Sequence, residues 1–179
     1  MFRVGIDMKK LLLISLLSGS VFAQNAYTEK EFYETGRLKS CIPYSNNNKD
    51  GIRKLYFESG KYLAKIPYKN GTLHGTFKEY YRSGKIKLEI PFENGTLNGV
   101  FKEYYSTGKP KLEIPFKDGE KNGIGKTFNT TGKMKKTLFL HGTFNGIIKV
   151  YSETDELLIQ ITIDKGKAKN DLTPREIVK

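Results

Sequence analysis

Hydrophobic and polar residues alternate one by one over several short stretches of the chain. The clearest stretch covers residues 85–92. Its apolar side chains occupy every second position: Ile86, Leu88, Ile90 and Phe92. A period of two places such side chains on one face of a β-strand. The alternation recurs over residues 62–68, 110–116 and 157–163, so the pattern predicts a series of half-buried strands.

The pattern repeats every 24 residues, and glycines mark the period. One series is Gly36, Gly60, Gly84, Gly108 and Gly132, and another is Gly51, Gly75, Gly99 and Gly123. Each unit also carries two turn signals. Pairs such as Ser83-Gly84 suit two-residue hairpin loops, and pairs such as Asn94-Gly95 suit a second reversal with left-handed backbone. Each unit is therefore expected to form two strands.

The pairing of the two strands follows from the hairpin loop. A loop at Ser83-Gly84 pairs Tyr81 with Ile86, Lys78 with Glu89 and Phe77 with Ile90. This register places Phe77 and Tyr81 on the apolar face. It also places Glu79 on that face, opposite Leu88, which the sequence alone does not explain.

The sequence predicts an all-β fold: an elongated single-sheet meander of tandem β-hairpin repeats of 24 residues. The array covers residues 24–166, with about five to six repeats, because the fifth unit is one residue short and the sixth decays into a tail. Residues 167–179 form a polar C-terminal tail or cap. A single sheet needs capping at its ends, and an uncovered aromatic face is expected to be a docking surface.

Two units carry a resemblance to a known repeat. Residues 75–84 and 99–108 share the pattern Gly-x-Phe-Lys-Glu-Tyr-Tyr-x-x-Gly. This pattern resembles the MORN-variant repeat of bacterial proteins, although Phe77 and Phe101 stand where tryptophan is common. The resemblance implies an elongated hairpin meander without known catalytic residues. Many chains with such repeats are labelled YwqK-type antitoxins of toxin–antitoxin systems, and the resemblance extends that role to this chain as an alternative function.

The composition limits which catalytic sites, disulfides and metal sites the chain can form. The 179 residues hold one cysteine, Cys41, and two histidines, His74 and His141. One cysteine excludes an internal disulfide framework and a cysteine-based zinc site. His74 falls in a turn position, and no phosphate-binding glycine loop or nucleophile motif is present. We therefore expect no enzyme activity, no cofactor and no metal.

The first 23 residues are typical of a secretory signal peptide. Lys9 and Lys10 precede an apolar run over residues 11–17, and small residues end at Ala23. Cleavage is expected between Ala23 and Gln24, and either Met1 or Met8 is the start. After cleavage no membrane-spanning segment is expected. The chain is thus predicted to be exported, to the periplasm, the cell surface or the medium.

The candidate contact residues are tyrosines and lysines that recur at the same position of successive repeats. They are Tyr56, Tyr80, Tyr104, Lys61, Lys85, Lys87, Lys109 and Lys111. The lysines are expected on the polar side of the second strand of each hairpin. Aromatic rings beside lysines can bind a protein, or an anionic surface of lipid or polysaccharide. Alternatively, the rings form a thin core, and the lysines form a solvated face that prevents edge-to-edge aggregation.

With 31 basic and 19 acidic residues, the formal charge is +12, which favours an anionic partner. Export argues against nucleic acid, and a second copy of the chain is a further candidate partner. We therefore predict a non-enzymatic exported repeat scaffold that binds another macromolecule, a protein or an anionic surface, through its sheet face. The alternative is an antitoxin or immunity protein that neutralises a toxin by direct binding.

Overall fold

A computed structural model describes residues 25–139, 146–151 and 156–172. The predicted signal peptide at residues 1–23, His141 and the C-terminal residues 173–179 lie outside the described residues. In the described part no helix is long and apolar enough to cross a membrane. The strands are β1 (Ala26–Phe32), β2 (Leu38–Ser45), β3 (Asn48–Lys49), β4 (Gly51–Tyr56), β5 (Tyr62–Lys69), β6 (Thr72–Leu73), β7 (Gly75–Tyr80), β8 (Ile86–Glu93), β9 (Thr96–Leu97), β10 (Gly99–Tyr104), β11 (Pro110–Lys117), β12 (Glu120–Lys121), β13 (Gly123–Phe128), β14 (Met134–Phe139), β15 (Gly146–Tyr151), β16 (Leu157–Asp164) and β17 (Lys167–Leu172).

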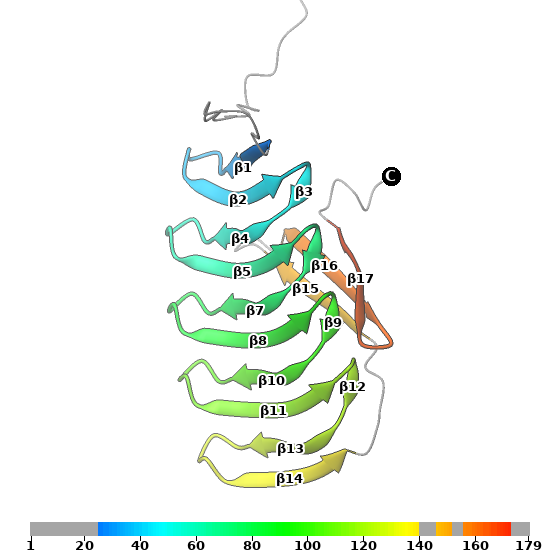
Figure 1. Cartoon of the computed structure of the whole chain (residues 1–179). Coiled ribbons are helices and arrows are strands. Elements are labelled where there is room, and N and C mark those ends of the chain that lie inside the picture. The colour runs from blue at the N-terminus through cyan, green and yellow to red at the C-terminus, as the bar shows by residue number, and fades with distance from the viewer. Residues whose placement is uncertain (1–24, 140–145, 152–155, 173–179) are drawn as a thin grey trace, which may run out of the picture.

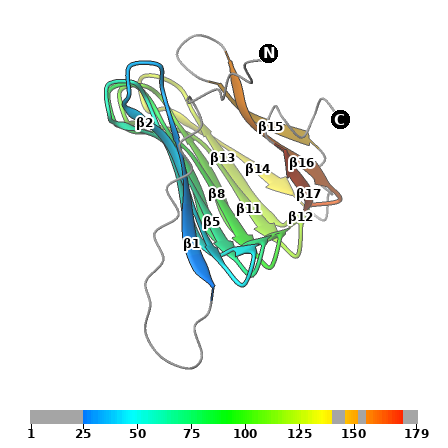
Figure 2. The same ribbon diagram turned by 90° about the horizontal axis from the view of Figure 1, so that it is seen from above.

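The strands from β1 to β14 form one antiparallel meander, which confirms the predicted fold class. Each long strand pairs with its neighbours along the chain, and the hairpins lie one above the next (Figure 1). Seen from above, the sheet is curled into a half-barrel with one convex and one concave face (Figure 2). This curvature agrees with the strong right-handed twist of antiparallel strands.

The predicted register of the β7–β8 hairpin is right in three of its four pairs, including Glu79 opposite Leu88. Lys78 lies opposite Glu89 and Phe77 opposite Ile90, as expected. The pairing of Tyr81 with Ile86 is wrong, because Ile86 lies opposite Tyr80 and the register shifts between Glu79 and Tyr80. Lys87 is the extra residue of this β-bulge.

The hairpin loops are longer than the two residues predicted. The amide of Tyr81 donates to the carbonyl of Lys85 at 2.9 Å, and the amide of Gly84 donates to the carbonyl of Tyr81 at 2.8 Å. This is a three-residue loop with Gly84 in the left-handed region at φ +90°, a position that glycine tolerates best. The same pair of bonds recurs at Phe57 and Tyr105.

The second reversal in each repeat is the tight turn that the sequence predicts. Asn94 and Gly95 have φ values of +48° and +77°, and Asn70 and Gly71 have +49° and +79°. Two successive positive φ angles define a type I′ turn, which matches the twist of the strands it joins. These turns stand in a row along one edge of the half-barrel (Figure 1).

The last strands do not extend the stack, which the sequence did not predict. The alternation over residues 157–163 does form a strand, but β15, β16 and β17 fold back and lie on the concave side of the meander (Figure 2). β15 pairs with β16 and β16 with β17. The three strands β15, β16 and β17 are together called the covering hairpin. Residues 167–172, expected as a tail or cap, form its last strand.

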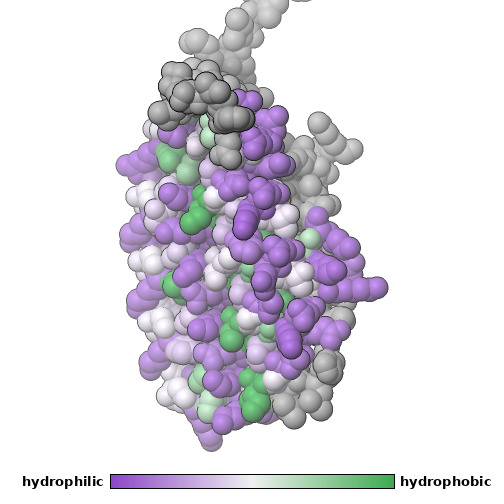
Figure 3. Space-filling view, viewed as in Figure 1, coloured by the Kyte–Doolittle hydropathy of each residue, from purple (hydrophilic) through white to green (hydrophobic). Residues whose placement is uncertain are grey.

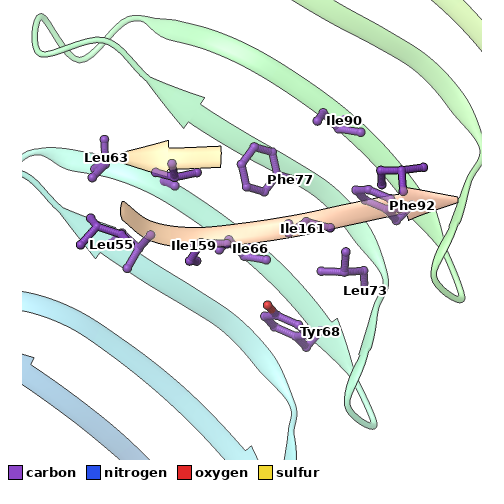
Figure 4. Close-up of a cluster of buried hydrophobic side chains, with 14 of the residues drawn as sticks. Leu55, Leu63, Ile66, Tyr68, Leu73, Phe77, Ile90, Phe92, Ile159 and Ile161 are labelled. Carbon is purple, nitrogen blue, oxygen red and sulfur yellow. The ribbon is translucent and has the colours of Figure 1, made fainter. Parts of the chain in front are cut away.

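The core lies between the concave face and the covering hairpin. Ile159 and Ile161 are fully buried and lie over Ile66, Phe77 and Phe92 (Figure 4). The other buried apolar residues of this cluster are Leu55, Phe57, Leu63, Ala64, Tyr68, Leu73, Ile90, Leu97, Phe116, Val150, Leu158 and Ile163. Burying the concave face in this way removes apolar surface that a bare single sheet would leave in water.

Three polar contacts hold the covering hairpin in place. The Lys39 ammonium lies 2.9 Å from the Glu156 carboxylate. The amide of Leu97 donates to the carbonyl of Gly166 at 2.9 Å, and the amide of Ala168 donates to the carbonyl of Gly95 at 2.8 Å. The turn between β16 and β17 is thereby hydrogen-bonded to the row of type I′ turns.

Two charged side chains, Arg53 and Glu79, are buried in the concave face. Arg53 is 2% exposed and occupies the position that Phe77 and Phe101 hold in the next two repeats. Its Nε and Nη1 atoms have no hydrogen-bond partner among the described residues, and the same holds for the buried hydroxyl of Ser40. Buried polar groups without partners are rare and destabilising.

Candidate partner-binding face

The covering hairpin leaves the convex face of the meander open. Every second residue of the long strands points to this face, because strand side chains alternate. Three aliphatic side chains stand at equivalent positions of the repeats and form an exposed aliphatic column, which Thr76 interrupts between the first two: Ile52 at 46%, Val100 at 43% and Ile124 at 51% exposure. In space-filling view, hydrophobic spots recur along the array between hydrophilic side chains (Figure 3).

Three tyrosines form a ladder that runs across two repeats. The ring centroids of Tyr56 and Tyr62 are 5.2 Å apart, and those of Tyr62 and Tyr80 are 6.2 Å apart. The Lys65 ammonium lies 3.7 Å from the centroid of Tyr62, a cation–π distance. Tyr56 and Tyr80 were predicted from the sequence, whereas Tyr62 and Lys65 were not. The alternation over residues 62–68 assigned Tyr62 to the apolar face, and the register shift between Leu55 and Tyr56 changes that assignment.

Tyr104 belongs to a hydrogen-bonded cluster in the next repeats. Its hydroxyl donates to the Glu89 carboxylate at 2.9 Å, and the Lys78 ammonium lies 2.9 Å from the same carboxylate. Burial and the neighbouring Glu89 raise the pKa of Tyr104 to about 12. Burial alone would raise the pKa of Glu89, but the hydrogen bonds from Lys78 and Tyr104 outweigh it and lower that pKa. The Glu89 carboxylate is therefore paired on this face.

Tyr56 lies beside Cys41 on the same face. The Sγ atom of Cys41 and the hydroxyl of Tyr56 are 4.0 Å apart. Burial first, and the neighbouring Cys41 second, raise the pKa of Tyr56 to about 12. The phenol is therefore neutral at physiological pH and available as a hydrogen-bond donor. Cys41 itself is a half-buried free thiol.

A second set of tyrosines, one residue after the ladder positions in each repeat, forms hydrogen bonds between hairpins. The hydroxyl of Tyr81 donates to the carbonyl of Tyr104 at 2.7 Å, and that of Tyr105 donates to the carbonyl of Phe128 at 2.8 Å. Tyr33 makes the equivalent bond to the carbonyl of Tyr56 at 2.6 Å. Each ring thus joins one hairpin to the next.

The predicted lysines fall into two groups at different places. Lys61, Lys85 and Lys109 stand in the hairpin loops, at the edge of the sheet. The Lys85 ammonium donates to the carbonyl of Thr107 at 2.7 Å, and that of Lys61 donates to the carbonyl of Arg82 at 3.4 Å. Lys61 and Lys85 therefore bridge neighbouring hairpins.

The second group points to the opposite side from the one predicted. Lys87 lies 2.7 Å from the carboxylate of Glu79, and Lys111 lies 2.7 Å from that of Glu103. Glu79 shares the concave face with Phe77, so Lys87 reaches that face as well. The expectation of one basic column on the polar side of the second strand is wrong, because the bulge at Lys87 turns its side chain toward Glu79. The sequence alone did not explain why Glu79 lies on the apolar face. In the structure, its carboxylate is paired there with the Lys87 ammonium.

His74 lies in a turn, as its position in the repeat predicted. Its Nδ1 atom is 3.2 Å from the Oδ1 atom of Asn94 in the next turn. Asp50, at the equivalent position, accepts a bond from the amide of Asn70 at 3.4 Å. In the described part of the chain, no group of three or more histidine, cysteine, aspartate or glutamate residues could hold a metal ion.

One protein family matches the chain. The model of the MORN repeat variant matches residues 28–46, 49–70, 73–94 and 97–118. These segments run from β1 to β11 and follow the 24-residue period of the glycines. The match is to a repeat family and not to an enzyme family. No curated protein matches the chain.

Proposed function

The chain belongs to the MORN repeat variant family, and on that basis we propose that it is an exported, non-enzymatic scaffold that binds a protein partner through its convex face. One observation carries the proposal: the concave face is filled by the chain's own covering hairpin, while the convex face carries the aliphatic column and the tyrosine ladder. Exposed aliphatic side chains beside half-buried tyrosines on one face are typical of protein-binding surfaces.

A protein is favoured over an anionic surface because the charges of the convex face are mixed. Lys78 is paired with Glu89, and Lys126 lies 3.2 Å from Glu113. Lys61 and Lys85 donate to backbone carbonyls, and Lys87 and Lys111 lie on the other face with glutamates. Lysines that are neutralised by neighbours add little attraction for a polyanion. The convex face keeps a basic run, because Lys54 lies opposite Lys65 and Lys65 lies opposite Lys78. The anionic-surface alternative is therefore tested separately.

Export is the first part of the proposal to test. Native cells are fractionated, and the intact mass of the protein is measured in each fraction. A chain that begins at Gln24 outside the cytoplasm supports export. A chain that retains Met1 or Met8 in the cytosol contradicts it and favours the cytosolic antitoxin.

Partner binding is tested by photocrosslinking in the native cells. A photoreactive amino acid replaces Val100 on the convex face, and in a matched control it replaces Lys117, an exposed residue at a strand end. The proposal expects one defined crosslinked protein band from position 100, which weakens in chains that also carry Ile52→Lys and Ile124→Lys. Equal crosslinking from position 117 contradicts a specific convex face.

The anionic-surface alternative has its own readout. The purified protein is mixed with vesicles of phosphatidylglycerol and phosphatidylethanolamine and sedimented at low and high salt. We expect no salt-sensitive binding. Binding that is lost at high salt, and abolished by combined Lys85→Glu and Lys109→Glu substitutions, would replace the protein partner by an anionic surface.

A further inference from the structure

One row of side chains crosses the middle of the convex face from the first hairpin to the last. Its members lie directly opposite one another on neighbouring strands, and paired residues share a face. From β1 to β14 the row consists of Lys30, Cys41, Lys54, Lys65, Lys78, Glu89, Lys102, Glu113, Lys126 and Lys136. The row is therefore basic around Lys65 and alternates in sign from Lys78 to Lys126.

Lys65 causes the difference between these two parts of the row. The second strands of the next two hairpins hold Glu89 and Glu113 at its position. Lys65 itself lies opposite Lys54 on one side and opposite Lys78 on the other. Like charges directly across a strand pair are destabilising. The free protein therefore keeps an unfavourable arrangement at Lys65 that the following repeats avoid.

The centre of this basic run has no carboxylate partner. Lys54 and Lys65 are half-buried, and neither forms an ion pair with any of the described residues. The Lys65 ammonium instead lies 3.7 Å from the ring centroid of Tyr62 and 5.8 Å from that of Tyr80. Cation–π contacts hold an ammonium in place but leave its charge unneutralised.

The tyrosine ladder adds hydrogen-bond donors beside the run. Burial is the largest cause that raises the pKa of Tyr56 to about 12, and it also raises the pKa of Tyr80. Both phenols therefore keep their protons at physiological pH and can donate, and an ammonium can only donate. We call Lys54, Lys65, Tyr56, Tyr62 and Tyr80 the lysine–tyrosine patch. Its donors are complementary to a ligand that presents several carboxylate acceptors.

Apolar side chains flank the patch on the side away from the tyrosines. Ile52 is 46% exposed and lies opposite Pro67. A protein segment can place carboxylates on the lysines and apolar side chains on Ile52 at the same time. The positive run from Lys54 to Lys78 spans two strand spacings, about 10 Å, and Glu89 follows it. Such a short run suits a segment of a protein better than an extended anionic surface.

From this charge complementarity, and resting on the proposed function, we propose that the lysine–tyrosine patch receives an acidic segment of the partner protein. Two or more of its carboxylates would lie across β4, β5 and β7. Each carboxylate would lie between lysines of neighbouring strands, as Glu89 lies between Lys78 and Lys102 within the chain. The partner thus supplies the negative charge that the following repeats supply themselves.

The experiment measures the binding of a defined acidic peptide to the purified full chain by fluorescence anisotropy. The probe is a short labelled peptide in which glutamate alternates with serine, and its control carries glutamine in place of glutamate. Titrations are made at low and high salt. We expect saturable binding of the glutamate peptide that weakens as salt rises, and no binding of the glutamine peptide.

Lys65→Glu gives the basic run the charge pattern of the following repeats. It is expected to weaken peptide binding about tenfold or more, because the new carboxylate repels those of the peptide. Its midpoint of urea unfolding is expected to equal or exceed that of the wild type, because two like-charge pairs become opposite-charge pairs. Damage to the fold cannot produce a loss of binding without a loss of stability.

Lys54→Gln and Lys102→Gln form a matched pair of variants. Both lysines occupy the same position of a first strand, two repeats apart, but Lys102 already lies between Glu89 and Glu113. Lys54→Gln is expected to weaken binding about threefold or more, and Lys102→Gln less than about twofold. Equal losses would contradict the proposal, because they would show attraction to the net charge of the chain and not to the patch.

Four further results would overturn the proposal. They are no saturable binding of the glutamate peptide up to about 1 mM, unchanged binding by Lys65→Glu, a Lys65→Glu chain clearly less stable than the wild type, and binding to phosphatidylglycerol vesicles that Lys65→Glu abolishes. The last result would assign the patch to lipid phosphates.

Failure of this proposal and failure of the proposed function give different results. A defined crosslinked partner at position 100 without peptide binding leaves the proposed function standing and removes the acidic segment. Peptide binding that requires Lys65, without a crosslinked partner, supports the patch and contradicts a protein partner along the convex face in cells.

Discussion

Gly166 packs directly against the backbone of Gly119. A β-carbon at Gly166 would lie 2.0 Å from the carbonyl oxygen of Gly119 and 2.2 Å from its Cα atom. Gly166 also has a φ of +73° in the turn between β16 and β17. Only a residue without a side chain fits there, so this contact fixes where the covering hairpin meets the row of type I′ turns.

Gly166→Ala is therefore expected to detach the covering hairpin at its turn. The β-carbon would displace backbone and not a flexible side chain, so the loss in free energy of unfolding is expected to be about 2–4 kcal/mol. Denaturant unfolding of the purified variant measures this loss. Hydrogen exchange should show faster exchange for the amides of Leu97 and Ala168, which bond to this turn and its neighbour.

Gly60→Ala is the matched control for the backbone conformation. Gly60 has a φ of +86°, and a β-carbon there would have nothing within 4 Å. The substitution pays only the left-handed backbone penalty, on the order of 1 kcal/mol. Equal losses for the two variants would show that the contact with Gly119 does not anchor the hairpin.

The pair of Glu79 and Lys87 predicts an asymmetric response to substitution. The side chain of Glu79 is 10% exposed, whereas that of Lys87 is 44% exposed. Lys87→Met leaves a buried carboxylate without its ammonium and is expected to destabilise by about 1–3 kcal/mol. Glu79→Leu leaves a lysine that can reach water, so its effect is expected to stay within about 1 kcal/mol.

The preceding repeat shows which residues can replace both members of this ion pair. Leu55 and Leu63 occupy the positions of Glu79 and Lys87 and are buried. The chain with Glu79→Leu and Lys87→Leu is expected to be as stable as the wild type or more stable, because apolar packing replaces a partly buried ion pair. A double variant less stable than Lys87→Met in urea unfolding would contradict this account.

Arg53→Met tests the buried guanidinium. Two of its nitrogen atoms have no hydrogen-bond partner among the described residues, and the next repeats hold phenylalanine at this position. Removing the charge is expected to raise the free energy of unfolding by about 1–3 kcal/mol. Lys54→Met, one residue further on the other face, is the control and is expected to change little. A clear loss on Arg53→Met would show that the guanidinium has a stabilising partner.

Local pattern was sufficient to predict the strands and the type I′ turns. Alternation over residues 85–92 and the pair Asn94-Gly95 each depend on neighbours in sequence, and both features occur where expected. The bulge was not predictable in this way. The sequence alternates regularly through Lys87 even though Lys87 is the extra residue of the bulge. Only the pairing of β7 with β8 reveals the bulge.

The fold-back of the last hairpin depends on contacts between distant segments. Residues 157–163 alternate as a strand of the stack does, so the sequence gives no sign that Ile159 and Ile161 lie across the concave face. The candidate site shares this limit. Tyr56, Tyr80 and Tyr104 are half-buried positions that periodicity could find, but the bond from Lys85 to Thr107 requires the distance between hairpins.

Tyr81→Phe tests the bonds that join successive hairpins. The hydroxyl of Tyr81 donates to the carbonyl of Tyr104, and phenylalanine already occurs at the equivalent position as Phe57. Losing this bond while the ring stays in place is expected to reduce the free energy of unfolding by about 0.5–1.5 kcal/mol. Tyr80→Phe, on the convex face, is the control. Similar small losses in both variants would remove the joining role of the Tyr81 hydroxyl.

The cluster of Glu89, Lys78 and Tyr104 predicts pH dependence at both extremes. The hydrogen bonds that lower the pKa of Glu89 below 4.5 stabilise the folded chain fully above that value, and their contribution is lost as pH falls through the lower folded pKa. Glu89→Gln should therefore be less stable than the wild type at pH 7, and the two should converge in acid. A stability difference that is unchanged down to about pH 2 would contradict this linkage.

At alkaline pH, the titration of Tyr104 determines whether stability rises or falls with pH. Its pKa is raised from 10.0 to about 12, so the unfolded chain loses this proton first. The associated stability is present below pH 10 and is lost as pH rises toward 12, because ionisation then favours the unfolded chain. The difference in phenolate absorbance between the wild type and Tyr104→Phe should follow this late titration. In Glu89→Gln the Tyr104 titration should move to lower pH while staying above 10, since burial is the larger cause of the raised pKa. A Tyr104 phenol that titrates at 10 in the folded wild type would show that it is neither buried nor bonded to Glu89.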